Sequence, residues 1–129
     1  MKPDLEDVLF FHTVCVELYG GAGGVRDEGS LEAAVARPWL AVQGEEAFPS
    51  PYAKAAAICE SIIRRHPFVD GNKRTAVSAA AYLLERHGLE LTATPAELEN
   101  FAVEAAESHT PTSELARWFE EHAARRSES

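Results

Sequence analysis

The sequence predicts an all-α fold, a single compact bundle of about six helices, and three observations support this prediction. Apolar residues recur at intervals of three and four along most of the 129 residues, which gives a helix one apolar face. The segments between these runs are short and contain most of the Pro and Gly residues. A content of 46% hydrophobic and 26% charged residues is typical of a globular protein with one core. We therefore expect residues 1–129 to form one domain around a central buried helix.

The first third of the chain predicts two helices joined by a glycine-rich loop. The first helix covers residues 3–19, and its inward stripe is Leu5, Val8, Leu9, His12, Cys15, Val16 and Tyr19. The loop at residues 20–24 lacks the Lys-Ser/Thr pair of a P-loop, so a flexible connector is expected rather than a phosphate site. A short second helix covers residues 28–37, with Leu31, Ala34 and Val35 facing inward.

Residues 38–51 contain three prolines and a glycine, which predicts an irregular segment or a short hairpin. It is either a plain connector or a loop that contacts substrate. The third helix then begins with Ser50 as N-cap and Pro51 at its first position. Pro67 makes further helix unlikely after His66, which continues the apolar stripe. We therefore expect His66 at a helix end, facing the interior or a cleft.

The fourth helix follows residues 70–72 and runs to about His87, with Gly88 as its stop. Between residues 76 and 84 only Ser78 is distinctly polar, so we expect this helix to be the most buried one. Residues 88–93 form a short link, which could be extended.

The C-terminal part predicts two more helices. Thr94 and Glu97 form a capping box with Pro95 at the first helical position, and Thr112 or Ser113 caps the sixth helix. The inward residues are Leu98, Phe101, Ala102 and Ala105 in the fifth helix and Leu115, Trp118, Phe119 and His122 in the sixth. Residues 125–129 are expected to fray.

Charge and composition limit the classes of partner. The net charge of −9 argues against direct, phosphate-driven binding of nucleic acid. No apolar run is long enough to span a bilayer and no signal pattern opens the chain, so we expect a cytoplasmic protein. Cys15 and Cys59 are expected as buried thiols, and His12, His87 and His122 as core histidines.

Residues 66–74 read His-Pro-Phe-Val-Asp-Gly-Asn-Lys-Arg, a combination that local structure does not explain. Lys73 and Arg74 fall in the first turn of the fourth helix, where each charge opposes the helix dipole by about 0.3–1 kcal/mol. Gly71 and Asn72 can adopt backbone angles that turn successive N–H groups toward an anion. The sequence therefore predicts a phosphate site at this turn.

The same stretch supplies groups for catalysis. His66 is a candidate general base, with a satisfied core histidine as the alternative. Asp70 is either the N-cap of the fourth helix or a ligand for Mg²⁺. Arg64, just before the motif, either contacts phosphate or target or is a solvated charge. A base, a metal ligand, N–H groups and cations are what phosphoryl or nucleotidyl transfer requires.

This stretch resembles the signature of the Fic/Doc superfamily, and specifically of its Doc (death-on-curing) branch. The longer Fic signature is His-Pro-Phe-x-Asp/Glu-Gly-Asn-Gly-Arg-x-x-Arg. Here Lys73 replaces the second Gly and Val77 stands at the last Arg, and both departures match the Doc form. The chain length and residues 26–38 are also similar to Doc proteins. The resemblance implies the helical Fic/Doc fold.

The resemblance also implies roles for single residues. His66 activates a target hydroxyl, Asp70 positions Mg²⁺ on the phosphates of ATP, and residues 71–74 hold those phosphates. Similarity to the Doc branch implies a toxin that transfers the γ-phosphate to a threonine of elongation factor Tu and arrests translation. A cognate, Phd-like antitoxin is implied as the inhibitor, since the inhibitory Ser/Thr-x-x-x-Glu-Gly/Asn pattern of some Fic proteins is absent from the sequence.

Two other interpretations stay open at the level of sequence. One is a Fic-type enzyme that transfers AMP instead of phosphate, because sequence does not fix the orientation of the nucleotide. The other is a catalytically idle co-repressor that partners a DNA-binding antitoxin.

Overall fold

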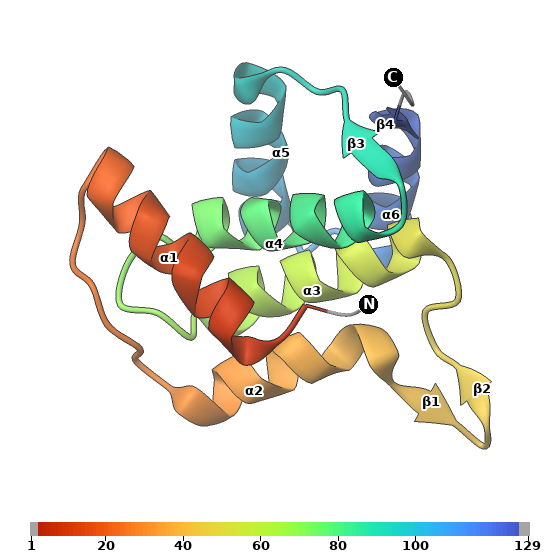
Figure 1. Ribbon diagram of the computed structural model, residues 1–129, viewed down its shortest axis with the longest axis horizontal. Coiled ribbons are helices and arrows are strands. Elements are labelled where there is room, and N and C mark those ends of the chain that lie inside the picture. The colour runs from red at the N-terminus through yellow and green to blue at the C-terminus, as the bar shows by residue number, and fades with distance from the viewer. Residues whose placement is uncertain (1–2, 127–129) are drawn as a thin grey trace.

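The computed structural model describes residues 3–126 and contains six α-helices in that range (Figure 1). They are α1 (Leu5–Tyr19), α2 (Glu28–Ala36), α3 (Pro51–Arg65), α4 (Asn72–Arg86), α5 (Pro95–Ser108) and α6 (Thr112–Glu121). A 3₁₀ turn, η1 (Arg37–Trp39), follows α2. The expected helical bundle is confirmed.

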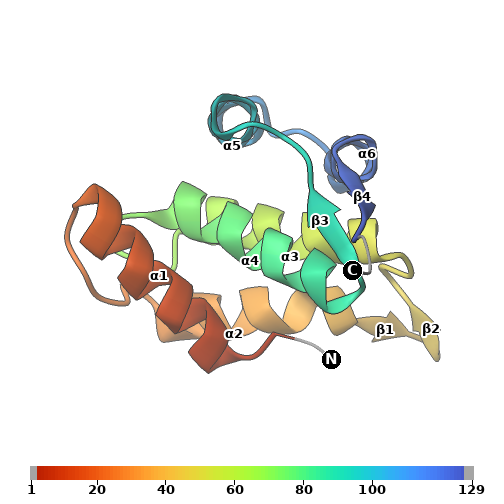
Figure 2. The ribbon, with the colours of Figure 1, turned by 45° about the horizontal axis from the view of Figure 1, so that its top comes forward.

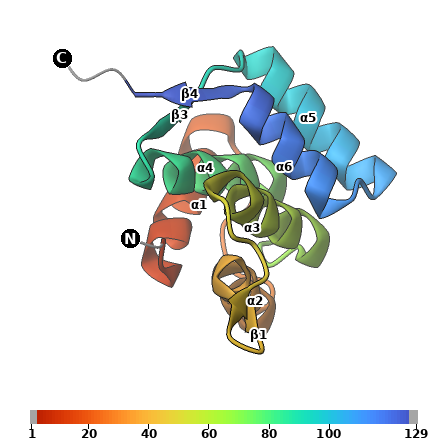
Figure 3. The same cartoon turned by 90° about the vertical axis from the view of Figure 1, so that its right-hand side faces the viewer.

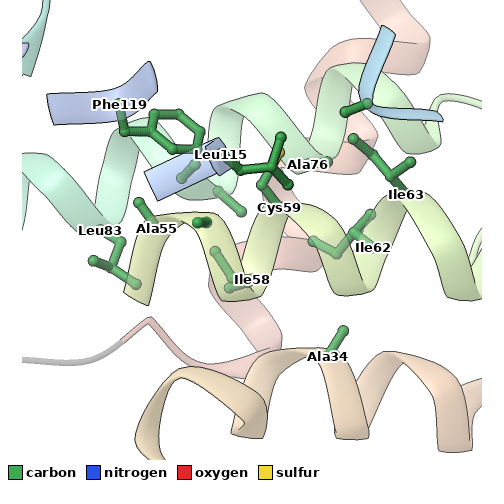
Figure 4. Close-up of a cluster of buried hydrophobic side chains, with 14 of the residues drawn as sticks. Ala34, Ala55, Ile58, Cys59, Ile62, Ile63, Ala76, Leu83, Leu115 and Phe119 are labelled. Atoms are coloured by element: carbon green, nitrogen blue, oxygen red, sulfur yellow. The ribbon is translucent and has the colours of Figure 1, made fainter. Parts of the chain in front are cut away.

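The central helix of the bundle is α3. Every residue from Lys54 to Ile63 is buried, and α3 packs against α2, α4 and α6 (Figure 3). Ala55, Ala56 and Ala57 allow this close approach, because small side chains let helix axes come together on several sides. Figure 4 shows Ile58, Cys59 and Ile62 of α3 among Leu83, Leu115, Phe119 and Ala34.

The prediction that the fourth helix is the most buried was wrong. Helix α4 buries Thr75, Ala76, Ala79, Ala80, Leu83 and Leu84, but both of its ends carry exposed charges. Its apolar residues suggested burial all round, yet alanine fits a half-exposed face as readily as a buried one. The motif at residues 66–74 consequently joins the central helix α3 to α4, rather than opening the central helix itself.

Two pairs of short strands complete the fold. The hairpin expected within residues 38–51 is β1 (Ala41–Val42) paired antiparallel with β2 (Glu45–Glu46). It precedes the N-terminus of α3, whereas His66 follows the C-terminus of α3 (Figures 1 and 2). The 15 residues of α3 separate the two by about 22 Å at 1.5 Å per residue. The hairpin therefore does not contribute to the motif.

The second strand pair involves the C-terminal segment. Strand β3 (Leu89–Leu91), in the segment expected to be extended, pairs antiparallel with β4 (Ala123–Arg125), and Arg126 N–H donates to the Gly88 carbonyl at 2.9 Å. The expectation of a frayed end was wrong for Arg125 and Arg126, because this backbone pairing holds them. The other residues expected to fray, 127–129, lie outside the described residues.

Most helix boundaries follow the caps that the sequence indicates, and three differ. Ser50 caps α3, and the capping box of Thr94 and Glu97 opens α5. Helix α1 starts after a capping box of Asp4 and Asp7 rather than at residue 3, and α2 ends one residue early. Helix α6 begins after Pro111 without a side-chain cap. Neither Thr112 nor Ser113 caps it, because both lie inside the helix; the Thr112 hydroxyl donates to Glu60 Oε2 at 2.7 Å.

Side-chain burial agrees with most of the predicted stripes. Cys15 and Cys59 are buried free thiols, and burial raises the pKa of Cys59 to about 12. Four residues placed on the inward side are exposed, and all lie at helix ends: Leu5, Tyr19, His66 and His87. Helix ends have fewer neighbours than helix centres. A periodic apolar stripe does not show at which residue the neighbouring helices stop covering it. None of the described helices is long and apolar enough to cross a membrane.

Candidate active site

His66 ends α3 in a left-handed conformation, with φ of 48°, and its side chain is exposed. Of the two placements expected for His66, the interior or a cleft, the interior is wrong for a local reason. The left-handed residue turns the chain at the end of the helix, so that Pro67 and Phe68 enter the core and His66 stays at the surface. Phe68 is fully buried and anchors the motif loop.

Asn72, the first residue of α4, ties the motif loop together. Its Oδ1 accepts from Phe68 N–H at 3.0 Å, and its Nδ2 donates to the Phe68 carbonyl at 2.9 Å. The same Nδ2 lies 3.3 Å from His66 Nδ1. An amide nitrogen only donates, so His66 Nδ1 is the acceptor in this arrangement. The neutral ring then carries its proton on Nε2.

His12 of α1 packs against the loop at residues 66–71. It is buried, as the sequence predicted, and its ring stacks on Phe68 at 3.9 Å between centroids. Its Nε2 donates to the Asp70 carbonyl at 2.8 Å. A side chain on Gly71 would come within 3.5 Å of the His12 ring, and Gly71 has φ of 79°. His12 is therefore a positioning residue of the motif, which the sequence did not indicate because 58 residues separate it from Asp70.

The glycine-rich loop after α1 forms one wall of the site. Ala22 N–H donates to Asp70 Oδ2 at 2.8 Å, and Val69 N–H donates to the Gly24 carbonyl at 3.1 Å. A Cβ on Gly21 would lie 3.2 Å from the Asp70 Cβ. Residues 20–24 were expected to be a connector only. The structure shows that they fix the Asp70 carboxylate.

Asp70 does not cap α4. The N-cap is Gly71, which has no side chain to accept a hydrogen bond. One oxygen of the Asp70 carboxylate takes the Ala22 N–H, and Oδ1 accepts from no group within the described residues. Of the two roles that the sequence left open for Asp70, the structure removes the N-cap.

Arg26 is a further residue of the site with a structural role. Its Nε donates to the His66 carbonyl at 2.6 Å and its Nη2 to the Arg65 carbonyl at 2.7 Å. The backbone N–H of Arg26 donates to the Pro67 carbonyl at 2.7 Å. A cation on the last carbonyls of a helix is favourable for the dipole and satisfies groups that have no helical partner. Arg26 thereby fixes the backbone of the turn that presents His66.

The N-terminus of α4 has the features of an anion site. Across residues 3–126, the backbone N–H groups of Asn72, Lys73 and Arg74 have no acceptor, and the first helical bond comes from Thr75 to Gly71 at 3.0 Å. The Lys73 ammonium forms no ion pair in that range. Three free N–H groups, the positive end of the dipole and two cations on the same turn favour phosphate.

A cavity of about 490 Å³ adjoins this turn, between α1, α4 and α5. Its walls are mostly apolar, and Gly71, Lys73 and Arg74 lie along it. The other lining residues are Cys15, Tyr19, Val77, Ser78, Pro95, Leu98, Glu99, Ala102 and Val103. The anion site is therefore continuous with a pocket of the size that small-molecule ligands occupy.

Arg64 points elsewhere. Its Nη2 donates to the Thr110 carbonyl at 2.8 Å and lies 3.8 Å from Glu60 Oε2. These contacts direct the guanidinium to the turn between α5 and α6. The structure therefore does not bring Arg64 to the phosphate site with His66, Asp70, Gly71, Asn72, Lys73 and Arg74.

Comparisons with known proteins place the chain in a family. The profile of the Fic/DOC family matches residues 2–84, a range that includes the motif and all of its supporting residues. The chain is 48% identical to a protein named Toxin Doc from Mycolicibacterium smegmatis, over 70% of this chain and 67% of that protein. It is also 32% identical to Protein kinase doc of Escherichia phage P1, over 86% of each chain. The protein therefore belongs to the Fic/Doc family, in its Doc toxin branch.

Proposed function

We propose that this protein is a Doc-like toxin that transfers the γ-phosphate of ATP to a hydroxyl of a protein, by resemblance a threonine of elongation factor Tu. Translation arrest is the expected effect, and a Phd-like antitoxin is the expected inhibitor. One observation carries the proposal: free N–H groups, Lys73 and Arg74 lie on the helical turn that follows Asp70 and is tied through Asn72 to His66. The name of the phage P1 relative, 32% identical, is that of a protein kinase.

The residues at this turn fit a magnesium–nucleotide complex. Among residues 3–126 no cluster of three or more His, Cys, Asp or Glu side chains could hold a resident metal. One carboxylate, Asp70, beside a phosphate site is instead the usual arrangement for Mg²⁺ that arrives with a nucleotide. When bound, the ion would neutralise charge on the phosphate oxygens, with Asp70 as its protein ligand.

His66 is the proposed proton acceptor for the target hydroxyl. Its exposed ring is accessible to a protein substrate, which a buried histidine would not be. Accepting a proton at Nε2 requires the tautomer with the proton on Nδ1, and that proton would face the Asn72 amide, which is also a donor. The ring must therefore leave Asn72 when it acts as a base at Nε2.

The transfer of phosphate rather than AMP is supported by two positions. Val77 lines the cavity and adds no charge beyond Arg74. Lys73 fills room that a glycine would leave open at the start of α4. Compared with the longer Fic signature, the part of the cavity beside Lys73 and Val77 then has less space and one arginine fewer. A triphosphate tail would fit poorly there, which favours an orientation with the terminal phosphate near His66.

Incubation of the protein with Mg²⁺, a cell extract and ATP labelled at either the γ or the α position distinguishes the two reactions. We expect protein-bound label from γ-labelled ATP only, and none with His66→Ala. Label that arrives only from the α position would establish AMP transfer and contradict the kinase proposal.

The co-repressor alternative predicts a different result in cells. Expression of the wild-type chain without an antitoxin should stop growth, and His66→Ala should restore it. Absence of toxicity from a folded wild-type protein would support the idle co-repressor, whereas full toxicity of His66→Ala would contradict the role of His66 as base.

A further inference from the structure

Tyr19 and Arg74 form a contact that neither the fold nor the proposed chemistry has accounted for. The Arg74 guanidinium carbon lies 4.2 Å from the centroid of the Tyr19 ring. Tyr19 is the last residue of α1 and Arg74 belongs to the first turn of α4, so the pair joins two helices at the mouth of the 490 Å³ cavity.

The contact does not serve the hydrophobic core. Tyr19 is 62% exposed, and its hydroxyl has no partner among the residues that the structure describes. Arg74 is also exposed and forms no ion pair or hydrogen bond in the same range. Within the described part of the chain, the ring of Tyr19 is thus the one partner of this guanidinium among hydrogen bonds, ion pairs and ring contacts.

An aromatic face orients an arginine in a way that a carboxylate cannot. A carboxylate partner would occupy the N–H donors of the guanidinium and cancel its charge. Stacking on a ring uses the face of the guanidinium and leaves its five donors and its charge available. Arg74 is therefore held in place with its donors free, which is the state that recognition of phosphate requires.

We propose that Tyr19 is the positioning residue for Arg74, and that the pair acts as a preformed clamp for the phosphates of the nucleotide. The proposal rests on the proposed function in that phosphate binds at the start of α4. Lys73, which has no partner within residues 3–126, supplies charge there without fixed geometry. Tyr19 consequently affects affinity for the nucleotide and not the proton transfer at His66.

Equilibrium binding of Mg²⁺–ATP and of inorganic pyrophosphate to the purified protein tests this proposal. Tyr19→Ala and Tyr19→Leu should each raise the Kd for both ligands about two- to fivefold, as expected for loss of one exposed cation–π contact. Tyr19→Phe keeps the ring and should bind like wild type. Leu18→Ala is the matched control, since Leu18 is 70% exposed at the same helix end and contacts no cation.

The effect must also depend on Arg74. In an Arg74→Ala background, Tyr19→Ala should have no further effect on either Kd, and Tyr19→Ala alone should raise the KM for ATP with kcat unchanged. Wild-type affinity in Tyr19→Ala, or an equal loss in the Arg74→Ala background, would overturn the proposal.

The binding data also separate this proposal from the proposed function. A wild-type protein that binds ATP and pyrophosphate with the expected Tyr19 dependence, but transfers no γ-phosphate, would refute the kinase reaction and leave the clamp intact. A wild-type protein that binds neither ligand would overturn both.

Discussion

His66 and His109 have the same backbone conformation. A comparison of the two can therefore separate the chemical role of the His66 side chain from effects of a left-handed residue at a helix end. Both residues are exposed and end a helix in the left-handed conformation, with φ of 48° and 49°. Of the two, only His66 belongs to the motif, and its ring lies beside the Asn72 amide. His109→Ala is therefore a matched control for His66→Ala.

We predict that His66→Ala lowers phosphate transfer about 10²- to 10⁴-fold, because that is the usual contribution of a general base. Its free energy of unfolding should change by less than about 0.5 kcal/mol, since the side chain is exposed. Transfer from γ-labelled ATP and denaturation by urea measure the two quantities. Equal activity in His66→Ala and His109→Ala would contradict the assignment.

Cys59 gives a prediction about pH. Burial, with Glu60 as a lesser cause, raises the pKa of the Cys59 thiol from 9.0 to about 12 in the folded protein. The neutral thiol is favoured by folding, so its contribution to stability is complete below pH 9 and is lost as the pH rises from 9 to about 12.

At pH 8 we therefore expect a thiol reagent to modify Cys59 only as fast as the protein unfolds. Labelling of Cys15→Ala, which leaves Cys59 as the single cysteine, measures this rate. Rapid labelling in the absence of denaturant would show that the thiol is not buried.

At the residue scale, sequence could identify the chemical groups but not their surroundings. His66, Asp70, Lys73 and Arg74 lie within nine residues of one another, at the turn between α3 and α4, and their roles stay predictions. The contacts from His12, Ala22 and Arg26 come from segments 39 to 58 residues away in the chain. No local pattern in one sequence connects such segments.

At the element scale, the glycine-rich loop after α1 sets the position of Asp70. Gly21 has φ of 107°, and a Cβ there would lie 3.2 Å from the Asp70 Cβ, so that Asp70 would have to shift slightly, while Gly20 has φ of 83° and open space around it. Alanine at either position incurs backbone strain of about 1–3 kcal/mol, because both residues have a positive φ that side chains rarely adopt. Only at Gly21 does it also displace the carboxylate.

We predict that Gly21→Ala and Gly20→Ala lower stability by similar amounts, but that only Gly21→Ala raises the Mg²⁺ concentration needed for half-maximal transfer. Thermal unfolding and a Mg²⁺ titration of the transfer rate measure the two effects. An unchanged Mg²⁺ dependence in Gly21→Ala would show that Asp70 does not need the loop.

A polar cluster attaches α6 to the central helix. Arg37 Nη1 lies 2.5 Å from Glu60 Oε1, and Glu60 Oε2 accepts from the Thr112 hydroxyl. The Glu60 side chain is 10% exposed and that of Arg37 is 28% exposed. Loss of the carboxylate would leave the guanidinium partly buried without its partner.

We predict that Glu60→Ala lowers the free energy of unfolding by about 2 kcal/mol, below the range for fully buried pairs because water screens part of Arg37. Glu104→Ala removes an exposed carboxylate of α5 and should change it by less than about 0.5 kcal/mol. Urea denaturation compares the two. Equal stabilities would mean that the cluster contributes nothing to the attachment of α6.

Which elements form and most of their inward stripes were predictable, whereas the helix that lies at the centre of the bundle was not. Ser50, Thr94 and the glycine after α4 mark helix ends through local hydrogen bonds, so a single sequence contains that information. Burial of α3 rather than α4 depends on which helices surround it. Helix α3 can be buried although it contains Lys54 and Glu60, because their charges are paired with Glu46 and Arg37 within the fold.

At the scale of the whole molecule, an acidic chain concentrates positive charge at one turn. The net charge is −9, yet Lys73 and Arg74 adjoin three free N–H groups at the start of α4. Such a distribution attracts a small polyphosphate locally and disfavours a polynucleotide overall. The helical fold was accessible from sequence because periodicity and caps are local signals. The motif marks this turn as the candidate phosphate site, but it does not indicate the direction in which a nucleotide lies.

The proposed reaction transfers the terminal phosphate of ATP to a protein hydroxyl. The most direct measurement is the intact mass of purified elongation factor Tu after incubation with this protein, ATP and Mg²⁺, with His66→Ala as the control. We predict a gain of one phosphate group on a threonine with the wild-type protein and no gain with His66→Ala. A gain of one AMP, or a phosphate gain that persists in His66→Ala, would contradict the account.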